Sequence, residues 1–238
     1  MEPYVGMYET SSALRSTKTQ YRARYNIPYS DEIVDVFRAR YDEYIRYCDR
    51  QFEDFMRQLR NRAVSDKSIV ILSSDHGEIF NRQYISHGWS LYEPETNIPL
   101  IIKESDTRKG LIINEIVDQI DITPTIMDLA EVPIPSWIEG RSLVPVMRGE
   151  RLPSSPAFSM ALHKNRSLGH KIEKGDIAVW KDHFKLIYSI DNGKSQLFNL
   201  KEDPDELNNL FDKEPEVGKH LLSLIQANLK KANEKISN

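Results

Sequence analysis

The sequence contains only one cysteine, Cys48, among its 238 residues, which excludes a disulfide bond within the chain. No apolar run comes near the roughly 20 residues that a helix needs to cross a bilayer. Residues 1–20 are polar and mixed, unlike a signal peptide. Neither sign of charge dominates, since the sequence has 32 Lys and Arg and 36 Asp and Glu, which gives a formal net charge of −4. We therefore expect neither a membrane span nor a nucleic-acid partner, and the cellular compartment stays open.

What the sequence does contain is typical of a folded globular chain. Hydrophobic residues make up 39% and charged residues 29%, and the length is sufficient to bury a substantial core. After Ser30, a residue suited to cap a helix, apolar side chains recur at three- and four-residue steps, which predicts one long helix. The stripe consists of Phe37, Tyr41, Tyr44, Cys48, Phe52, Phe55 and Leu59. We interpret Cys48 as a buried apolar filler on this stripe.

Two apolar runs follow the long helix and predict strands that are buried on both faces. They cover residues 68–72 and 98–103, and residues 121–130 predict a further helix with Pro124 in its first turn. A helix, a core strand, a loop and a second core strand are typical of an α/β fold. We predict a partial parallel-type sheet flanked by helices and assign residues 1–150 to it.

The pattern changes after residue 150. Short apolar or alternating runs are separated by turn residues such as Asn192-Gly193, which predicts a small antiparallel sheet. The last apolar stripe has helical spacing and consists of Val217, Leu221, Leu222, Ile225 and Leu229. We therefore predict a second domain over residues 151–238, in which a terminal helix packs on the small sheet.

Chemically versatile side chains follow the strand at 68–72. Asp75 and His76 stand where that strand ends, and His87 comes eleven positions after His76. Ligands of open α/β sheets bind at the carboxyl ends of strands, and a carboxylate beside an imidazole can hold a divalent metal ion. A loop of this length can return His87 to the same strand end. The alternatives are a turn with a capping carboxylate at Asp75 and a surface or structural histidine at 87. Glu78 is expected to be a solvated carboxylate or one that supports the site from outside the ligand shell.

The motifs around these residues resemble those of the sulfatase family, within the alkaline phosphatase superfamily. The resemblance begins with "SIVILSSDHGE" and "SHGWSLYEPETNIPLIIK". It continues in "IVDQIDITPTIMDLAEVPIPSWIEGRSLVPVMRG" and in "HFKLIYSIDNGKSQLFNLKEDPDELNNL". These four collinear stretches cover nearly the whole chain from about residue 25. Glu131 and Asn199 depart from the usual family residues, Gly and Asp, at positions that we interpret as structural.

The resemblance implies a metal-dependent hydrolase of sulfuric esters. Asp75 and His76 match the family's divalent-cation ligands; calcium is the expected ion, with magnesium, manganese and zinc as alternatives. His87 matches a loop position that contributes a basic group to the bound sulfate or phosphate ester, so it is the expected catalytic residue, with metal ligation as its second role. A phosphodiesterase or phosphonate monoester hydrolase of the same superfamily is the alternative, because the D-H-G form of the motif occurs there too.

Two features of the family are missing from the 238 residues. The nucleophile, a Cys or Ser in C/S-x-P-[SA]-R, has no counterpart, since Cys48 stands in "YCDRQF", and the first pair of metal-binding acids is absent as well. The resemblance therefore covers the C-terminal portion of a sulfatase, and we expect little or no hydrolysis from this chain alone. A non-catalytic interaction module is the third interpretation, with an exposed sheet edge through which copies of the chain associate.

Overall fold

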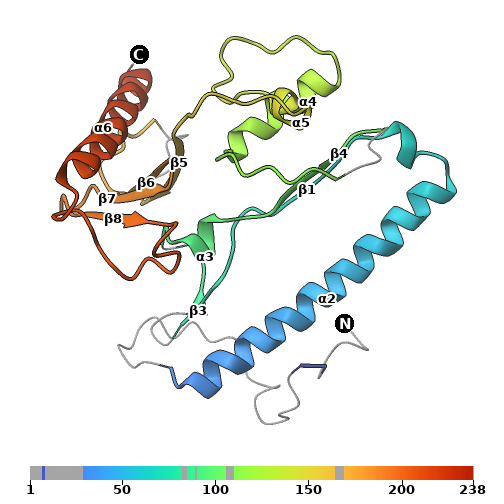
Figure 1. Cartoon of the computed structure of the whole chain (residues 1–238), viewed down its shortest axis with the longest axis horizontal. Helices are drawn as coiled ribbons and strands as arrows, with labels where there is room; N and C mark the ends of the chain where they lie inside the picture. The colour runs from blue at the N-terminus through green and yellow to red at the C-terminus, as the bar shows by residue number, and fades with distance from the viewer. Residues whose placement is uncertain are drawn as a thin grey trace. The chain divides into compact units, whose positions relative to one another are not determined.

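The computed structural model describes residues 7–8, 29–81, 85–88, 90–105, 110–163 and 169–237 (Figure 1). Contacts divide the chain into two compact units, residues 1–88 with 97–108, and residues 89–96 with 109–238. Helices and strands are mixed, and the predicted α/β class is confirmed. The predicted division into residues 1–150 and 151–238 stays a prediction. Among the described residues, no helix combines the length and the apolar character that crossing a membrane requires.

The first unit contains the long helix α2, Asp31–Asn61, which Figure 1 shows as one uninterrupted rod. Ser30 caps it as predicted, because the Ser30 side chain accepts a hydrogen bond from the backbone N–H of Ile33. The prediction that Cys48 is buried is wrong, since this cysteine is exposed. Helical spacing predicts an apolar stripe along the helix, but it does not predict whether another part of the chain packs on that stripe and buries it. On α2 the buried residues are Val34 and Glu43.

Strand β1, Val70–Ser73, pairs with β4, Leu100–Lys103, in the same unit. The pairing is antiparallel, with Val70 opposite Lys103, so the predicted parallel-type arrangement of these two strands is wrong. Parallel neighbours need a crossover connection, usually through a substantial helix. The connection here holds the strands β2, Ile79–Phe80, and β3, Ile85–Ser86, and the four-residue helix α3, Glu93–Thr96.

The second unit begins with short helical elements that are organised around one buried carboxylate. These elements are η2, Gln119–Asp121, α4, Ile122–Leu129, and α5, Val144–Met147. Asp121 accepts hydrogen bonds from the backbone N–H groups of Asp118 and Arg141. Gly140 has to be a glycine, because a Cβ at this position would lie 2.1 Å from the carbonyl oxygen of Ile120. The predicted helix at 121–130 is therefore confirmed as α4, within one residue at each end.

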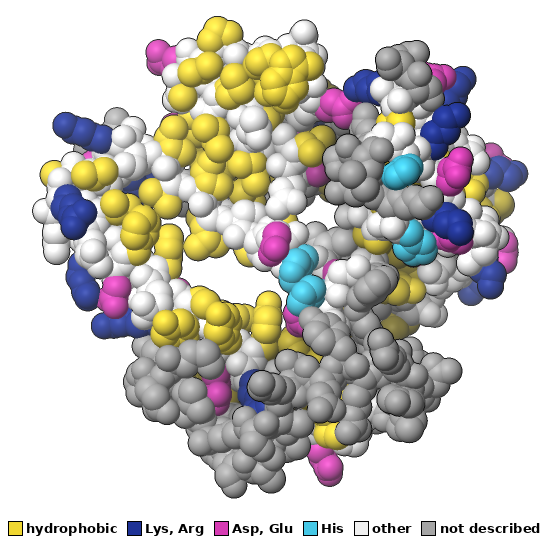
Figure 2. Space-filling view, turned by 180° about the vertical axis from the view of Figure 1, so that it is seen from behind, with side chains coloured by type: hydrophobic (Ala, Val, Ile, Leu, Met, Phe, Trp, Pro, Cys, Tyr) yellow, Lys and Arg dark blue, Asp and Glu magenta, His cyan; other side chains and the backbone are white. Residues whose placement is uncertain are grey.

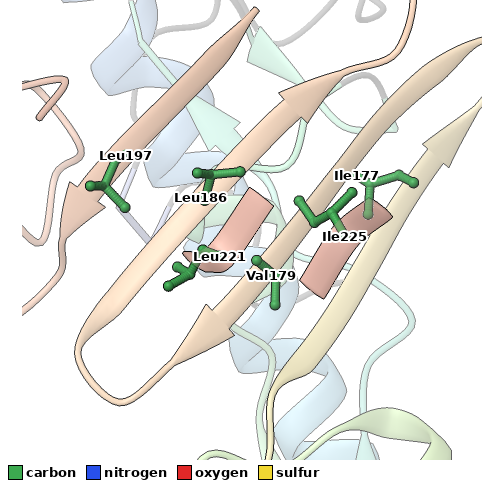
Figure 3. Packing of buried hydrophobic residues seen from close by; sticks show 6 residues of the cluster. All are labelled: Ile177, Val179, Leu186, Leu197, Leu221 and Ile225. Atoms are coloured by element: carbon green, nitrogen blue, oxygen red, sulfur yellow. The ribbon is translucent and has the colours of Figure 1, made fainter. Parts of the chain in front are cut away.

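The predicted small antiparallel sheet and terminal helix are also confirmed in this unit. The sheet has the order β5-β6-β7-β8, with strands Ala157–Leu162, Gly175–Lys181, Phe184–Ser189 and Ser195–Asn199. Helix α6, Pro215–Ser237, lies on it. Figure 3 shows the core between them, which consists of Ile177, Val179, Leu186, Leu197, Leu221 and Ile225. Each such side chain contributes about 1.5–3 kcal/mol when it is fully buried.

Candidate metal centre

The candidate centre lies in the first unit, where β1 ends and the chain turns. Hydrogen bonds of neighbouring residues hold this turn. The hydroxyl of Ser74 donates to the carbonyl oxygen of His76 at 2.6 Å, and the backbone N–H of His76 donates to Oδ1 of Asp75 at 3.1 Å. Ser73, the last residue of β1, donates to the carbonyl oxygen of Pro99 at 3.0 Å, which ties the strand end to the approach of β4. These hydrogen bonds therefore fix the backbone conformation of the turn that carries Asp75 and His76.

The structure brings the predicted metal ligands Asp75 and His76 close together. Oδ2 of Asp75 lies 3.7 Å from Nε2 of His76. Two ligands that each lie about 2.0–2.2 Å from one ion are separated by roughly 3–4 Å. The pair thus fits two ligands of one divalent ion. The Asp75 side chain is 86% exposed, so the predicted alternative of a capping carboxylate at a solvated turn fits the same geometry.

A short hairpin returns His87 to His76. Strands β2 and β3 pair with Ile79 opposite Ser86, so the chain reverses within the eleven-residue interval between the two histidines. The imidazole rings of His76 and His87 stack with centroids 4.0 Å apart and an interplanar angle of 22°. The loop length had suggested such a return, and the hairpin provides it.

The hairpin also brings Glu78 into the centre. The same register continues outward to place Glu78 opposite His87, and Oε2 of Glu78 lies 2.7 Å from Nδ1 of His87. The Glu78 side chain is 17% exposed, so the alternative of a solvated carboxylate does not fit, whereas the alternative of a carboxylate that supports the site from outside the ligand shell does. The signal that would have found it is the hairpin pairing, which local composition does not reveal. His76, Glu78 and His87 can each bring one ligand atom to within 4.8 Å of the others.

Helix α2 supports the hairpin from one side. The guanidinium of Arg38 donates to the carbonyl oxygen of Phe80 at 3.3 Å, and the ring of Tyr41 packs on that of Phe80 with centroids 5.2 Å apart. Partial burial raises the pKa of the Tyr41 hydroxyl, and the negative charge of Glu78 raises this pKa further.

Comparisons with known proteins match most of the chain. The family model described as Sulfatase matches residues 2–132, and the model described as N-sulphoglucosamine sulphohydrolase, C-terminal, matches residues 85–235. Arylsulfatase K from Homo sapiens is 31% identical over 201 residues, which cover 79% of this chain and 36% of the relative. An arylsulfatase from Clostridium perfringens is 29% identical over 185 residues, which cover 74% of this chain and 36% of the relative.

Solved structures share the fold. A phosphonate monoester hydrolase of Agrobacterium radiobacter superposes with a TM-score of 0.73 at 21% identity, covering 86% of this chain and 43% of the other. The 2-O GAG sulfatase BT1596 superposes with a TM-score of 0.71 at 19% identity, covering 90% and 47%. At such identities the likeness concerns the fold alone. The chain thus spans about a third of the length of these curated relatives and about half of these solved chains.

Proposed function

The chain belongs to the sulfatase family, and from this premise we propose that it forms the metal-binding side of an active site that hydrolyses sulfuric esters. The observation that carries the proposal is the position of Asp75 and His76. They follow a core strand directly, and their Oδ2 and Nε2 atoms lie 3.7 Å apart, a distance that suits two ligands of one ion. The arylsulfatases among its relatives favour a sulfate ester as the substrate.

Each residue of the centre has a separate task in this proposal. Asp75 and His76 hold the divalent ion, which when bound polarises an ester oxygen and stabilises charge on the transferred group. His87 is the catalytic residue, because its imidazole binds the ester oxygens or donates a proton to the leaving group. Glu78 accepts the Nδ1–H of His87 and so keeps Nε2 as the basic nitrogen of that ring.

The nucleophile of the complete site is not among these residues. The 238 residues contain no C/S-x-P-[SA]-R sequence. We therefore propose that this chain alone hydrolyses esters slowly or not at all, and that the complete reaction needs a nucleophile from outside these residues. A non-catalytic interaction module, in which the same fold serves association, is the alternative from another class.

A phosphate or phosphonate ester is the second candidate substrate. The D-H-G form of the motif and the fold shared with a phosphonate monoester hydrolase both favour it. Sulfate is the first candidate because the relatives from Homo sapiens and Clostridium perfringens, at 31% and 29% identity, are arylsulfatases. The two candidates differ in the charge of the transferred group, so paired substrates with one leaving group discriminate between them.

A chimeric enzyme tests the proposed function. Residues 29–238 of this chain would replace the matching region of human arylsulfatase K, which supplies the remainder of the fold. Hydrolysis of 4-nitrophenyl sulfate would be measured beside 4-nitrophenyl phosphate and a 4-nitrophenyl phosphonate. We expect metal-dependent turnover of the sulfate, with activity near background in the variants Asp75→Ala and His76→Ala.

The control is His163→Ala, which removes an exposed imidazole in the second unit. A chimera that unfolds cooperatively on heating yet hydrolyses none of the three esters contradicts the proposal. Turnover that survives His76→Ala contradicts the assignment of the metal ligands. If the chimera hydrolyses the phosphate or the phosphonate faster than the sulfate, the substrate is a phosphorus ester, the second candidate.

A further inference from the structure

Residues 90–96 follow the loop of His87 along the chain but pack in the second unit. The first unit runs to Gly88 and resumes at Asn97, and the residues between these two positions belong to the second unit. The chain leaves His87 through Gly88, whose φ of +87° suits a glycine. Strand β4 begins soon afterwards, at Leu100. We call residues 90–96 the anchor segment, because they connect His87 to β4 and pack on the C-terminal sheet.

The anchor segment packs on the face of the sheet β5-β6-β7-β8 that lies opposite α6. Side chains alternate between the two faces of a strand. The face toward α6 carries Ile177, Val179, Leu186 and Leu197. Residues that alternate with these form a second cluster, in which Leu91 of the anchor segment, 4% exposed, is buried with Ala178, Ile187 and Phe198. The anchor segment therefore completes the core on the second face of the sheet.

Strand register aligns the partners of the anchor segment in two rows across the sheet. One row consists of Ala178, Ile187 and Gln196, and the other of Trp180, Lys185 and Phe198. The hydroxyl of Tyr92 lies 3.2 Å from Nε2 of Gln196 in the first row. In the second row, the indole N–H of Trp180 and the ammonium of Lys185 donate to Oε1 of Glu93 at 2.8 Å and 2.9 Å. Such charge-assisted hydrogen bonds are strong, so they fix the position of the segment together with the buried apolar contacts.

We propose that the anchor segment is a positioning element, through which the sheet of the second unit fixes the loop of His87 and the start of β4. Its effect on catalysis rests on the proposed function. Two residues separate His87 from Ser90, and consecutive Cα atoms lie about 3.8 Å apart, so the loop can move little once the segment is held. A displacement of about 1 Å can lower an enzymatic rate about 100-fold. Glu93 and Ile187 therefore affect the reaction without contacting the ester.

Kinetics of the chimera with arylsulfatase K test this role. Ile187→Ala and Ile177→Ala remove the same groups from neighbouring strands, the first beneath the anchor segment and the second beneath α6. We expect kcat for 4-nitrophenyl sulfate, calculated per folded molecule, to fall about 10- to 100-fold in Ile187→Ala and in Glu93→Gln, with little change in KM. Ile177→Ala should keep the kcat of the unchanged chimera. If an alanine variant does not fold, Ile187→Val and Ile177→Val provide the same comparison.

Hydrogen exchange of the 238-residue chain tests the anchoring without any turnover. Backbone amides exchange faster where the structure opens locally. We expect faster exchange in β3 and β4 for Ile187→Ala and Glu93→Gln than for the unchanged chain. Ile177→Ala should leave the exchange of these two strands unchanged and speed exchange in α6, which packs on that residue.

Three results would overturn the inference. One is unchanged exchange of β3 and β4 in both Glu93→Gln and Ile187→Ala. Another is an equal effect of Ile187→Ala and Ile177→Ala on exchange or on kcat, which would indicate general destabilisation. The third is an unchanged kcat of Ile187→Ala and Glu93→Gln in an active chimera. A chimera that hydrolyses none of the esters, while exchange responds as expected, contradicts the proposed function and supports the anchoring.

Discussion

Nζ of Lys185 lies 2.7 Å from Oε1 of Glu206 in the second unit, and these side chains are 0% and 1% exposed. The same ammonium lies 2.9 Å from Oε1 of Glu93, and the indole ring of Trp180 faces it at 4.6 Å. Trp180 also donates its indole N–H to Oε1 of Glu93 at 2.8 Å. One buried cation thus serves two carboxylates, which joins α3 to the C-terminal sheet within this unit.

Removal of the shared cation should destabilise the second unit strongly. In Lys185→Met, the buried Glu206 and the half-buried Glu93 lose the ammonium that compensates them. Breaking a buried charge pair from one side costs about 3–5 kcal/mol. We expect the free energy of unfolding to fall by about this amount, as measured by urea unfolding followed by far-ultraviolet circular dichroism.

The comparison variant is Lys219→Met, which removes an exposed ammonium that lies 3.5 Å from Glu216. Exposed pairs contribute about 0–1 kcal/mol, so this variant should unfold close to the unchanged chain. Equal effects of the two variants would show that burial of the Lys185 network adds nothing to its energy.

The same network predicts a dependence of stability on pH. Burial raises the pKa of the Glu206 carboxyl above its usual value, against the opposing attraction of Lys185. The negative charge of Glu93, which shares the same ammonium, raises the pKa of Glu206 slightly further. Below the usual pKa, Glu206 is protonated in both folded and unfolded chains. As the pH rises through the raised pKa, ionisation costs more in the folded chain, and this contribution to stability is lost.

Glu206→Gln should remove that contribution. We expect the stability of the unchanged chain relative to Glu206→Gln to decrease as the pH rises from the usual glutamate pKa through the raised pKa of Glu206, measured by urea unfolding at each pH. Glu139 provides the opposite case, since its hydrogen bond from Lys235 lowers the pKa of Glu139. The stabilising effect of Glu139 is present above its usual pKa and lost as the pH falls. If the free energy of unfolding changed with pH in the same direction for both substitutions, Glu206→Gln and Glu139→Gln, the opposite pKa shifts assigned to these two carboxyls would be contradicted.

Local sequence patterns predicted which segments form helices and strands better than they predicted how these elements pair and pack. The apolar spacing after Ser30 predicted α2, and the short alternating runs predicted the strands that pair in the order β5-β6-β7-β8. The pairing of β1 with β4 was predicted wrongly, because an apolar run does not encode the direction of its neighbour. The exposure of Cys48 has a similar cause, since periodicity defines a face without identifying what covers it.

At the candidate site, too, the sequence identified individual residues but not the contacts between them. Asp75 and His76 could be selected from the sequence because they directly follow a core strand. His87 could be proposed from loop length, but its stacking on His76 depends on the β2–β3 hairpin. The contact of Glu78 with His87 follows from strand register. Register is a property of paired strands and could not be deduced from two strands of two residues each.

Exposed apolar side chains in the first unit predict association between chains. Phe55 on α2 is 53% exposed and Ile101 on β4 is 60% exposed. Figure 2 shows patches of hydrophobic side chains on one face of the molecule. Among the described residues β1 and β4 form a sheet of two strands, which leaves strand edges without partners. We expect light scattering to show concentration-dependent dimers or larger species, and Ile101→Lys to reduce them.

Leu207→Lys is the control for this prediction, because Leu207 is 78% exposed in the second unit, outside the β1–β4 sheet. It should leave the association unchanged. A chain that stays monomeric at all concentrations would contradict both the predicted association and the interaction-module alternative.

The isolated chain should bind its ion and still fail to turn over an ester. Asp75, His76 and His87 can supply a cation and a basic group, which stabilise charge but form no bond to sulfur. Covalent attack needs a nucleophile, and Cys48, the single cysteine, lies on α2 outside the hairpin that carries His87. We therefore expect 4-nitrophenyl sulfate to be hydrolysed at the background rate, with or without added Ca²⁺, Mg²⁺, Mn²⁺ or Zn²⁺. Metal-dependent turnover that Asp75→Ala abolishes would show that these residues contain a complete site, with a nucleophile that the sequence motifs do not identify.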